Sequence, residues 1–176
     1  MRRVALLLVA VSVLGIGITA GPAQAAKEKK ITDCKKDKNL DANIAKAFDT
    51  YLSGDTTAIK MSLVEDGDKI APISDKGAAA ALANGQTNSS TTTQTFNVQA
   101  TCDGKKAATF TYDLATGIPK PVTAPPTKGL GLNFAGDAVL SKKGVWLVSA
   151  LTVCDLIGKN PLTPTLGAEC LAVVGG

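Results

Sequence analysis

The apolar residues of this chain change their spacing halfway along it, and this change restricts the fold more than any other feature. Between residues 40 and 85 the apolar positions recur every three or four residues, which predicts helices. Asn39, Asp55 and Ser74 are each typical N-cap residues at the start of such a stretch. We therefore expect three helices in the first half, beginning after these caps.

From Phe96 onward the apolar residues alternate with polar ones, which is the period of a strand. Two such runs flank the turn Asp103-Gly104 and predict a hairpin. Four prolines between residues 115 and 129 predict a long surface loop. Residues 130–140, with a bulge at Gly136, and residues 145–153 are the expected third and fourth strands. The fourth is apolar on both faces, which favours a central position.

Helices followed by consecutive antiparallel strands are typical of an α+β fold. We expect the N-terminal helices to pack on one face of a curved four-stranded antiparallel sheet. Residues 40–157 would form this domain. Residues 158–176 show no period and contain prolines and a glycine, so we expect an irregular C-terminal tail.

The first 25 residues have the features of a secretory signal peptide. A basic head precedes an apolar run, and Ala23-Gln24-Ala25 is a small-residue cleavage site. The apolar run is too short to span a bilayer, and no later segment is apolar over a spanning length. We therefore predict a secreted protein with no membrane span after removal of the signal.

Residues 26–39 form a lysine-rich arm. Two interpretations are open for it: a patch that binds the cell wall or acidic lipids, or a solvated arm held by Cys34. The arm has no aromatic residue, and we favour the solvated arm.

Four cysteines in an exported chain predict two disulfides. Three pairings are possible for Cys34, Cys102, Cys154 and Cys170. In a four-stranded meander Cys102 and Cys154 lie at opposite ends of the sheet, so they should not pair directly. Two pairings remain. We prefer Cys34 with Cys102 and Cys154 with Cys170, because the second bridge then closes over a short tail.

Two short motifs carry a resemblance to a known family. Ser62-Leu63-Val64-Glu65-Asp66-Gly67 and Trp146-Leu147-Val148-Ser149 resemble motifs of the actinobacterial, including mycobacterial, low-molecular-weight secreted antigen family. The resemblance implies a cystatin-like α+β cone, similar to the nuclear transport factor two superfamily, and no known enzymatic activity. The chain departs from the family pattern at Asp66, where glycine is usual, and at Ala150, where arginine is frequent.

The residues missing from the chain exclude several kinds of chemistry. Beyond the signal peptide there is no histidine and no arginine, since Arg2 and Arg3 are the only arginines. An imidazole base, a histidine-bound metal and a guanidinium clamp are therefore all excluded. Seventeen lysines against fifteen acidic residues leave a net charge of +2, too low to indicate nucleic acid as a partner. We expect no cofactor and no metal.

Two clusters of ionisable residues are candidate sites. Glu65, Asp66 and Asp68 surround Gly67, but they lack the spaced oxygen ligands of an EF-hand, so a solvated helix terminus is favoured over calcium binding. Tyr112 and Asp113 are the acid and base types used by cone-fold isomerases and dehydratases. Neighbours on a strand point to opposite faces, so both cannot enter one cavity.

The strands also supply an apolar lining for a ligand space inside the cone. Its candidate residues are Phe96, Phe110, Tyr112, Phe134 and Trp146. Ordinary core packing explains the same residues, and an enclosed ligand would be apolar and uncharged, such as a lipid. We hypothesise a secreted, non-catalytic binding or interaction domain of the cell envelope or culture fluid, with an apolar envelope ligand or a protein as partner. The alternative is a small cone-fold enzyme that uses Asp and Tyr on an apolar substrate.

Overall fold

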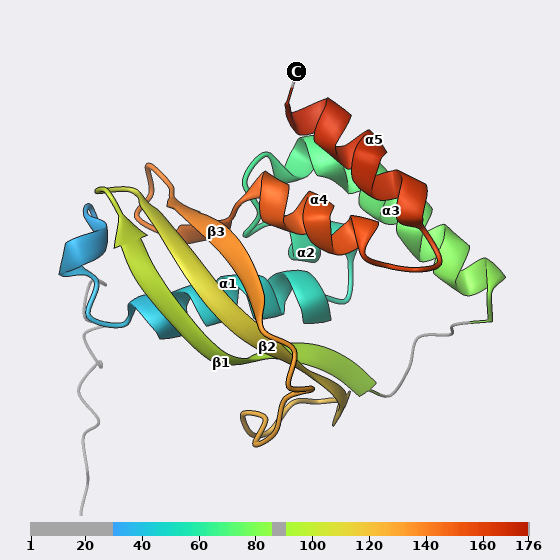
Figure 1. Cartoon of the computed structure of the whole chain (residues 1–176), viewed down its shortest axis with the longest axis horizontal. Coiled ribbons are helices and arrows are strands. Elements are labelled where there is room, and N and C mark those ends of the chain that lie inside the picture. The colour runs from blue at the N-terminus through green and yellow to red at the C-terminus, as the bar shows by residue number, and fades with distance from the viewer. Residues whose placement is uncertain (1–29, 86–90, 176) are drawn as a thin grey trace, which may run out of the picture.

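In the computed structural model, which describes residues 30–85 and 91–175, helices pack on a curled four-stranded antiparallel sheet (Figure 1). The strands, which lie in sequence order across the sheet, are β1 Thr91–Asp103, β2 Ala107–Pro119, β3 Phe134–Leu140 and β4 Trp146–Val148. The helices are η1 Cys34–Lys36, α1 Leu40–Ser53, α2 Thr57–Met61, α3 Gly67–Ala83, α4 Ala150–Gly158 and α5 Pro164–Val174. The predicted α+β fold is confirmed. The predicted signal peptide lies outside the described residues.

Helix α1 lies against the inner face of the sheet, which curls around it. The helix contacts both edge strands, β1 and β4. It begins directly after Asn39, as predicted, and its residues Ile44, Ala47 and Phe48 are buried. A side chain of the size of Ile or Phe stabilises a fold by about 1.5–3 kcal/mol when it is fully buried. The core of the domain therefore lies between α1 and the inner face of the sheet.

The outer edge of β1 is covered by two carboxylates of α1. Asp41 accepts a hydrogen bond of 2.8 Å from the backbone N–H of Ala100, and Asp49 accepts one of 2.6 Å from that of Thr95. An exposed strand edge would offer such N–H groups to another chain. The two aspartates, eight positions apart and so on one side of the helix, protect this edge.

Strand β4 lies at the other edge and is not central, contrary to the prediction. Its edge is covered by backbone pairing, because Val64 forms an isolated parallel bridge with Val148. The Val148 N–H donates to the carbonyl of Leu63 at 2.9 Å, and the Glu65 N–H donates to that of Val148 at 2.8 Å. The two motifs that carry the family resemblance thus lie side by side.

Two predicted helix caps are wrong: α2 begins after Thr56 and not after Asp55, and α3 begins at Gly67 and not after Ser74. Asp66 has a left-handed backbone, with φ of 51°, and turns the chain into the helix. Gly67 packs so closely on Met61 that a β-carbon at this position would collide with the Met61 carbonyl. The close packing at Gly67, together with the turn at Asp66, determines where the helix starts.

The C-terminal part of the chain is helical, which corrects two predictions. Residues 145–153 are not one strand, because Ser149 ends β4 and caps α4 by accepting the N–H of Thr152 at 3.1 Å. A short run that is apolar on both faces suits a buried helix as well as a strand. The tail is not irregular, since Pro164 occupies the first turn of α5. Proline is favoured at that point because no N–H is needed there.

Both disulfides of the preferred pairing are present. Cys34 is bonded to Cys102 with their Cα atoms 5.8 Å apart, and Cys154 is bonded to Cys170 with theirs 5.3 Å apart. The first joins η1 to the end of β1, and the second joins α4 to α5. Within the described ranges, no helix is long and apolar enough to cross a bilayer.

Candidate functional site

Three of the five residues predicted to line an apolar cavity form one aromatic cluster on the inner face of the sheet. The ring of Tyr112 lies 5.5 Å from that of Phe110 and 5.4 Å from that of Phe134, measured between centroids. Phe48 of α1 packs edge-on against Tyr112 at 4.7 Å and against Phe110 at 5.9 Å. The helix thus occupies the place that a ligand would take, and these rings contact each other as core residues do.

Phe96 lies on the opposite face of the sheet, so its predicted place in this lining is wrong. A β-bulge between Phe96 and Gln99 adds one residue to β1, and Asn97 within it has φ of 55°. One extra residue reverses the alternation, so the register pairs Phe96 with Asp113 on the outer face. The predicted bulge at Gly136 is also wrong, because β3 pairs there without a shift.

Asp113 holds the proline-rich loop and is not placed for acid or base chemistry. It lies on the outer face, as predicted, and its carboxylate accepts backbone N–H groups of Leu114, Gly131 and Leu132 at 2.7, 2.7 and 3.1 Å. Desolvation raises its pKa, but the backbone hydrogen bonds outweigh that effect and leave the pKa lowered. Tyr112 points to the other face, so the two do not meet.

Trp146, the fifth predicted lining residue, is buried and bonded to the lysine-rich arm. Its indole N–H donates to Asp37 at 2.8 Å, and Asn43 of α1 donates to the same carboxylate at 2.9 and 3.1 Å. Burial alone would raise the pKa of Asp37, but the hydrogen bonds from Asn43, Asn39 and Trp146 leave it lowered. This carboxylate anchors the arm to the core.

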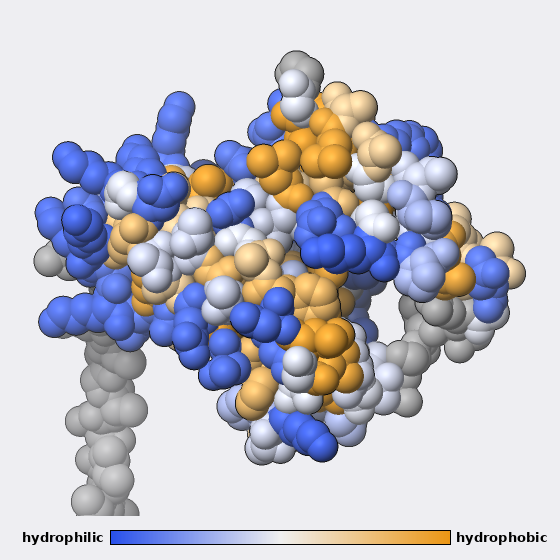
Figure 2. All heavy atoms as spheres, viewed as in Figure 1, coloured by the Kyte–Doolittle hydropathy of each residue, from blue (hydrophilic) through white to orange (hydrophobic). Residues whose placement is uncertain are grey.

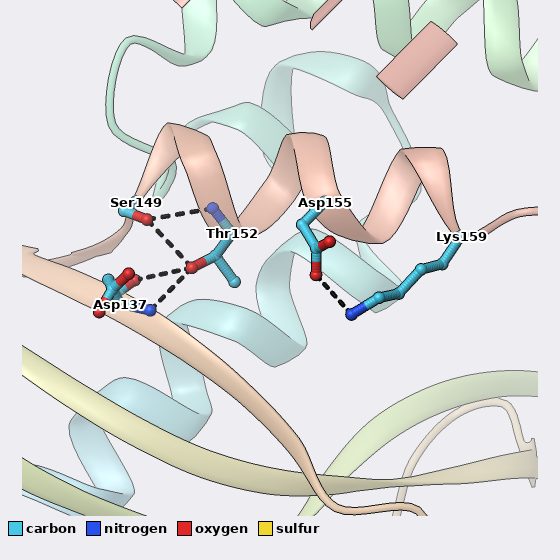
Figure 3. A network of polar contacts seen from close by, with 5 residues as sticks. All are labelled: Asp137, Ser149, Thr152, Asp155 and Lys159. Carbon is cyan, nitrogen blue, oxygen red and sulfur yellow. Dashed lines mark hydrogen bonds and ion pairs between the residues drawn. The ribbon is translucent and has the colours of Figure 1, made fainter. Parts of the chain in front are cut away.

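The environment of Tyr112 is unsuited to proton transfer near neutral pH. Burial, with a smaller effect from the charge of Asp155, raises the pKa of Tyr112 to about 12. Asp155 itself is more than half exposed and forms an ion pair of 2.6 Å with Lys159 (Figure 3). The ammonium of Lys159 also lies 5.6 Å from the centre of the Phe134 ring.

A groove of about 480 Å³ lies on the outer face of the sheet, with α4 as its wall. We call it the outer groove. Its polar lining consists of hydroxyl, amide and carboxylate groups from three strands and α4: Gln99, Thr101, Thr109, Thr111, Asp137, Thr152 and Asp155. Thr109 pairs with Thr101 on one side and Asp137 on the other, so these side chains stand in a row across the sheet. No lysine lines the groove among the residues described.

Helix α4 is fixed as the wall of this groove by a small polar network (Figure 3). The Thr152 hydroxyl accepts the N–H of Asp137 at 2.7 Å and lies 3.0 Å from the hydroxyl of Ser149. The Ser149 N–H donates to the Asp137 carbonyl at 2.8 Å. Gly136 permits the close approach, because a β-carbon there would lie 2.8 Å from both Thr152 and Phe110.

A second hollow, of about 540 Å³, lies between α1, the edge of β1 and residues 122–126 of the proline-rich loop. Its most buried acid is Asp49, whose carboxylate accepts both the N–H and the hydroxyl of Thr95 at 2.6 and 2.8 Å. Burial raises the pKa of Asp49 despite these bonds. Since the carboxylate is already used to hold β1, this hollow is a weaker candidate than the outer groove.

The acidic residues around Gly67 do not form a ligand set. Asp66 pairs with Lys69 at 3.0 Å across one turn of α3. Among the residues that the structure describes, no three acids, cysteines or histidines are close enough to hold a metal ion.

Sequence reasoning did not select the threonines of the outer groove, although the signal was present. They occupy the polar half of the alternation whose apolar half predicted the hairpin. The contribution of α4 to the groove could not be predicted, because that helix was predicted as part of a strand.

Comparison of the chain with protein families, with curated proteins and with solved structures found no match.

Proposed function

We propose that this protein is a secreted, non-catalytic binding domain of the cell envelope or culture fluid, and that it binds a neutral, hydroxyl-rich ligand of the saccharide class in the outer groove. The lining of that groove carries the proposal. Threonine hydroxyls donate and accept hydrogen bonds, and carboxylates accept them, which matches the hydroxyl groups of a sugar. Among the described residues the lining has two carboxylates and no lysine, and Lys159, which pairs with Asp155, lies outside it, so the groove does not favour an anionic ligand.

The arrangement of acids near the aromatic cluster supports binding over catalysis. An enzyme of the Asp and Tyr type needs a buried carboxylate that faces a cavity beside Tyr112 or Trp146. Asp155, near Tyr112, is exposed and paired with Lys159, and Asp37, beside Trp146, is saturated with hydrogen bonds. Phe48 fills the space beside Phe110 and Tyr112, so the proposal assigns no lipid to the interior.

The test is calorimetric titration of the oxidised protein with a panel of neutral oligosaccharides. The variant Thr109→Val/Thr111→Val removes two hydroxyls from the groove while keeping the shape and strand propensity of the side chains. We expect at least one oligosaccharide to bind, and the double variant to bind it on the order of tenfold more weakly, from the loss of about 0.5–1.5 kcal/mol per hydrogen bond.

Thr127→Val, on the exposed proline-rich loop, is the matched control and should bind as the parent does. Equal binding by the groove variant and the parent would contradict the proposal. So would release of a shorter sugar during the titration, because it would show that the protein is an enzyme.

A further inference from the structure

Three segments that are far apart in the sequence bring their lysines to one end of the sheet. They are the arm at residues 30–38, the β1–β2 turn with Lys105 and Lys106, and the β3–β4 turn with Lys142 and Lys143 (Figure 1). We call this end the lysine pole. It lies at the left of Figure 2, where hydrophilic side chains project from the surface.

Covalent and backbone bonds hold the three segments together. The Cys34–Cys102 disulfide joins the arm to the end of β1, and the Cys34 N–H donates to the carbonyl of Lys105 at 2.8 Å. The Leu140 N–H donates to the carbonyl of Lys106 at 2.7 Å, which places the second turn beside the first. The arm crosses the second turn so closely that a β-carbon at Gly144 would lie 2.6 Å from the Ile31 carbonyl.

Within the part of the chain that the structure describes, carboxylates do not neutralise the charge of the lysine pole. All eight of its lysines are exposed, and none forms an ion pair with a carboxylate of residues 30–85 or 91–175. The three aspartates at this end are Asp33, which caps η1, Asp37, which is bonded to Trp146 and Asn43, and Asp103 at the end of β1, so eight lysines stand against three acids. The remaining described residues carry seven lysines against eleven acids, so the molecule is positive at one end and negative elsewhere.

The side chains of the pole indicate the chemistry of its partner. Lysine is a mobile point charge, and without arginine the pole has no planar fork for a single phosphate. Eight such charges recognise the charge density of a repeating anion. Of the large apolar side chains exposed in the described ranges, Val145 alone belongs to this end, so the pole has little to insert into a bilayer.

We propose that the lysine pole binds a linear, base-free polymer with repeated phosphate groups, and that the Cys34–Cys102 disulfide assembles the binding surface. The three lysine-bearing segments have no aromatic side chain on which a base could stack, which disfavours a nucleic acid. This site is separate from the outer groove and does not depend on the proposed function. The disulfide matters because it fixes the arm, with its four described lysines, against the two turns. Charges held in one place attract a polyanion more strongly than charges on a free arm.

Inorganic polyphosphate is the probe, with binding measured by titration of the oxidised full chain at several salt concentrations. We expect binding that weakens steeply as salt rises, because bound counterions are released. Lys105→Gln/Lys106→Gln/Lys142→Gln/Lys143→Gln should lower the affinity by about five hundredfold, since each lysine near an anionic surface contributes about fivefold. These side chains are exposed, so the fold should be kept.

The matched control removes the same charge elsewhere, as Lys60→Gln/Lys69→Gln/Lys76→Gln/Lys128→Gln, and should lose less than about threefold. A second pair of variants tests the disulfide. Cys34→Ala/Cys102→Ala should weaken binding on the order of tenfold, whereas Cys154→Ala/Cys170→Ala should leave it unchanged.

Three results would overturn the proposal. One is absence of binding at low salt, and another is an equal loss in both lysine variants, which would show that net charge alone matters. The third is tighter binding to phosphatidylglycerol vesicles than to polyphosphate at equal phosphate concentration, which would assign the pole to a membrane surface.

Discussion

Each end of the molecule contains one disulfide, but polar hydrogen bonds support the first disulfide and close helix packing supports the second. At the lysine pole, Cys34–Cys102 spans 68 residues, and a polar clamp of Asp37, Asn43 and Trp146 adds to it. At the helical end, formed by α3, α4 and α5, Cys154–Cys170 spans 16 residues, and the helices meet through small residues. There Gly158 and Gly167 bring α4 and α5 into backbone contact.

The difference reflects what each end must hold. The arm before α1 is rich in lysine and has little apolar surface to bury, so a long-range disulfide and charged hydrogen bonds fix it. Helices α4 and α5 are apolar, and close packing between them is the main interaction that stabilises this end. Leu171 and Val173 of α5 remain about half exposed, which gives the helical end the hydrophobic surface seen at the top of Figure 2.

The largest expected effects come from removing each disulfide in turn. On the loop-entropy relation, Cys34→Ala/Cys102→Ala should lower the free energy of unfolding by about 4 kcal/mol and Cys154→Ala/Cys170→Ala by about 3 kcal/mol. Urea unfolding under oxidising conditions gives both values. A larger loss of stability in Cys154→Ala/Cys170→Ala than in Cys34→Ala/Cys102→Ala would show that the helical end depends more on its disulfide than its packing indicates.

Replacing glycines at the helical end by alanine distinguishes the effect of close packing on stability from the effect of helix propensity. Gly167→Ala should destabilise the protein by about 2–3 kcal/mol, because the new methyl group would collide with the Gly158 backbone. Gly77→Ala in α3 is the matched control, since its β-carbon would lie 3.8 Å from Leu166. We expect it to stabilise the protein by about 0.5–1 kcal/mol. The melting temperatures of the two variants test this prediction. Equal changes in melting temperature would contradict the close contact at Gly167.

Acid should loosen the lysine pole before the helical end. The pKa of Asp37 is lowered from 3.8, so its contribution is complete above about pH 5 and is lost as pH falls through 3.8 and the lower folded value. Asp37→Asn should cost about 1–2 kcal/mol at pH 7, and its difference from the parent should shrink in acid. Urea unfolding at several pH values, followed by Trp146 fluorescence, measures the difference in free energy of unfolding between Asp37→Asn and the parent. A difference that stays constant with pH would show that the charge of Asp37 does not stabilise the fold.

The smallest expected change is a gain at the start of α3. Asp66 holds a left-handed backbone that glycine adopts without strain, so Asp66→Gly should stabilise the protein by up to about 1 kcal/mol. The exposed pair with Lys69 that it removes contributes little. Asp66→Ala should instead destabilise, and a stabilising alanine in the same thermal assay would refute the backbone argument.

The sequence predicted the sheet side of the molecule better than the helical end, for physical reasons. The strict alternation around Asp103-Gly104 is compatible only with a hairpin. The even number of cysteines limited the possible disulfide partners of Cys34 and Cys102. At the helical end the run from Val145 to Val153 is apolar on both faces, so periodicity does not separate a strand from a helix. The cap at Ser149 decides that question, and Asp137 of β3, which is distant in the sequence, adds hydrogen bonds to Ser149 and Thr152.

The candidate site was the least predictable part. Its threonines lie on the face that alternation assigns to solvent, and its wall is the helix mistaken for a strand. Phe96 was misplaced because one extra residue at Asn97 reverses the faces of β1, and the asparagine, a residue type that tolerates a left-handed backbone, marks that bulge only weakly. The lysine pole depends on contacts between the arm and two distant turns, of which the cysteine pairing alone was visible in the sequence.

The most direct test is to follow the backbone amide signals of the oxidised protein by NMR while a neutral oligosaccharide and then polyphosphate are added. We expect the sugar to shift the amides around Thr101, Thr109, Thr111 and Asp155, and polyphosphate to shift those of the arm and of the turns at residues 105–106 and 142–143. Sugar-induced shifts centred on the buried α1 residues Ile44, Ala47 and Phe48, or the appearance of a converted sugar in the sample, would contradict a filled, non-catalytic domain that binds through its outer surface.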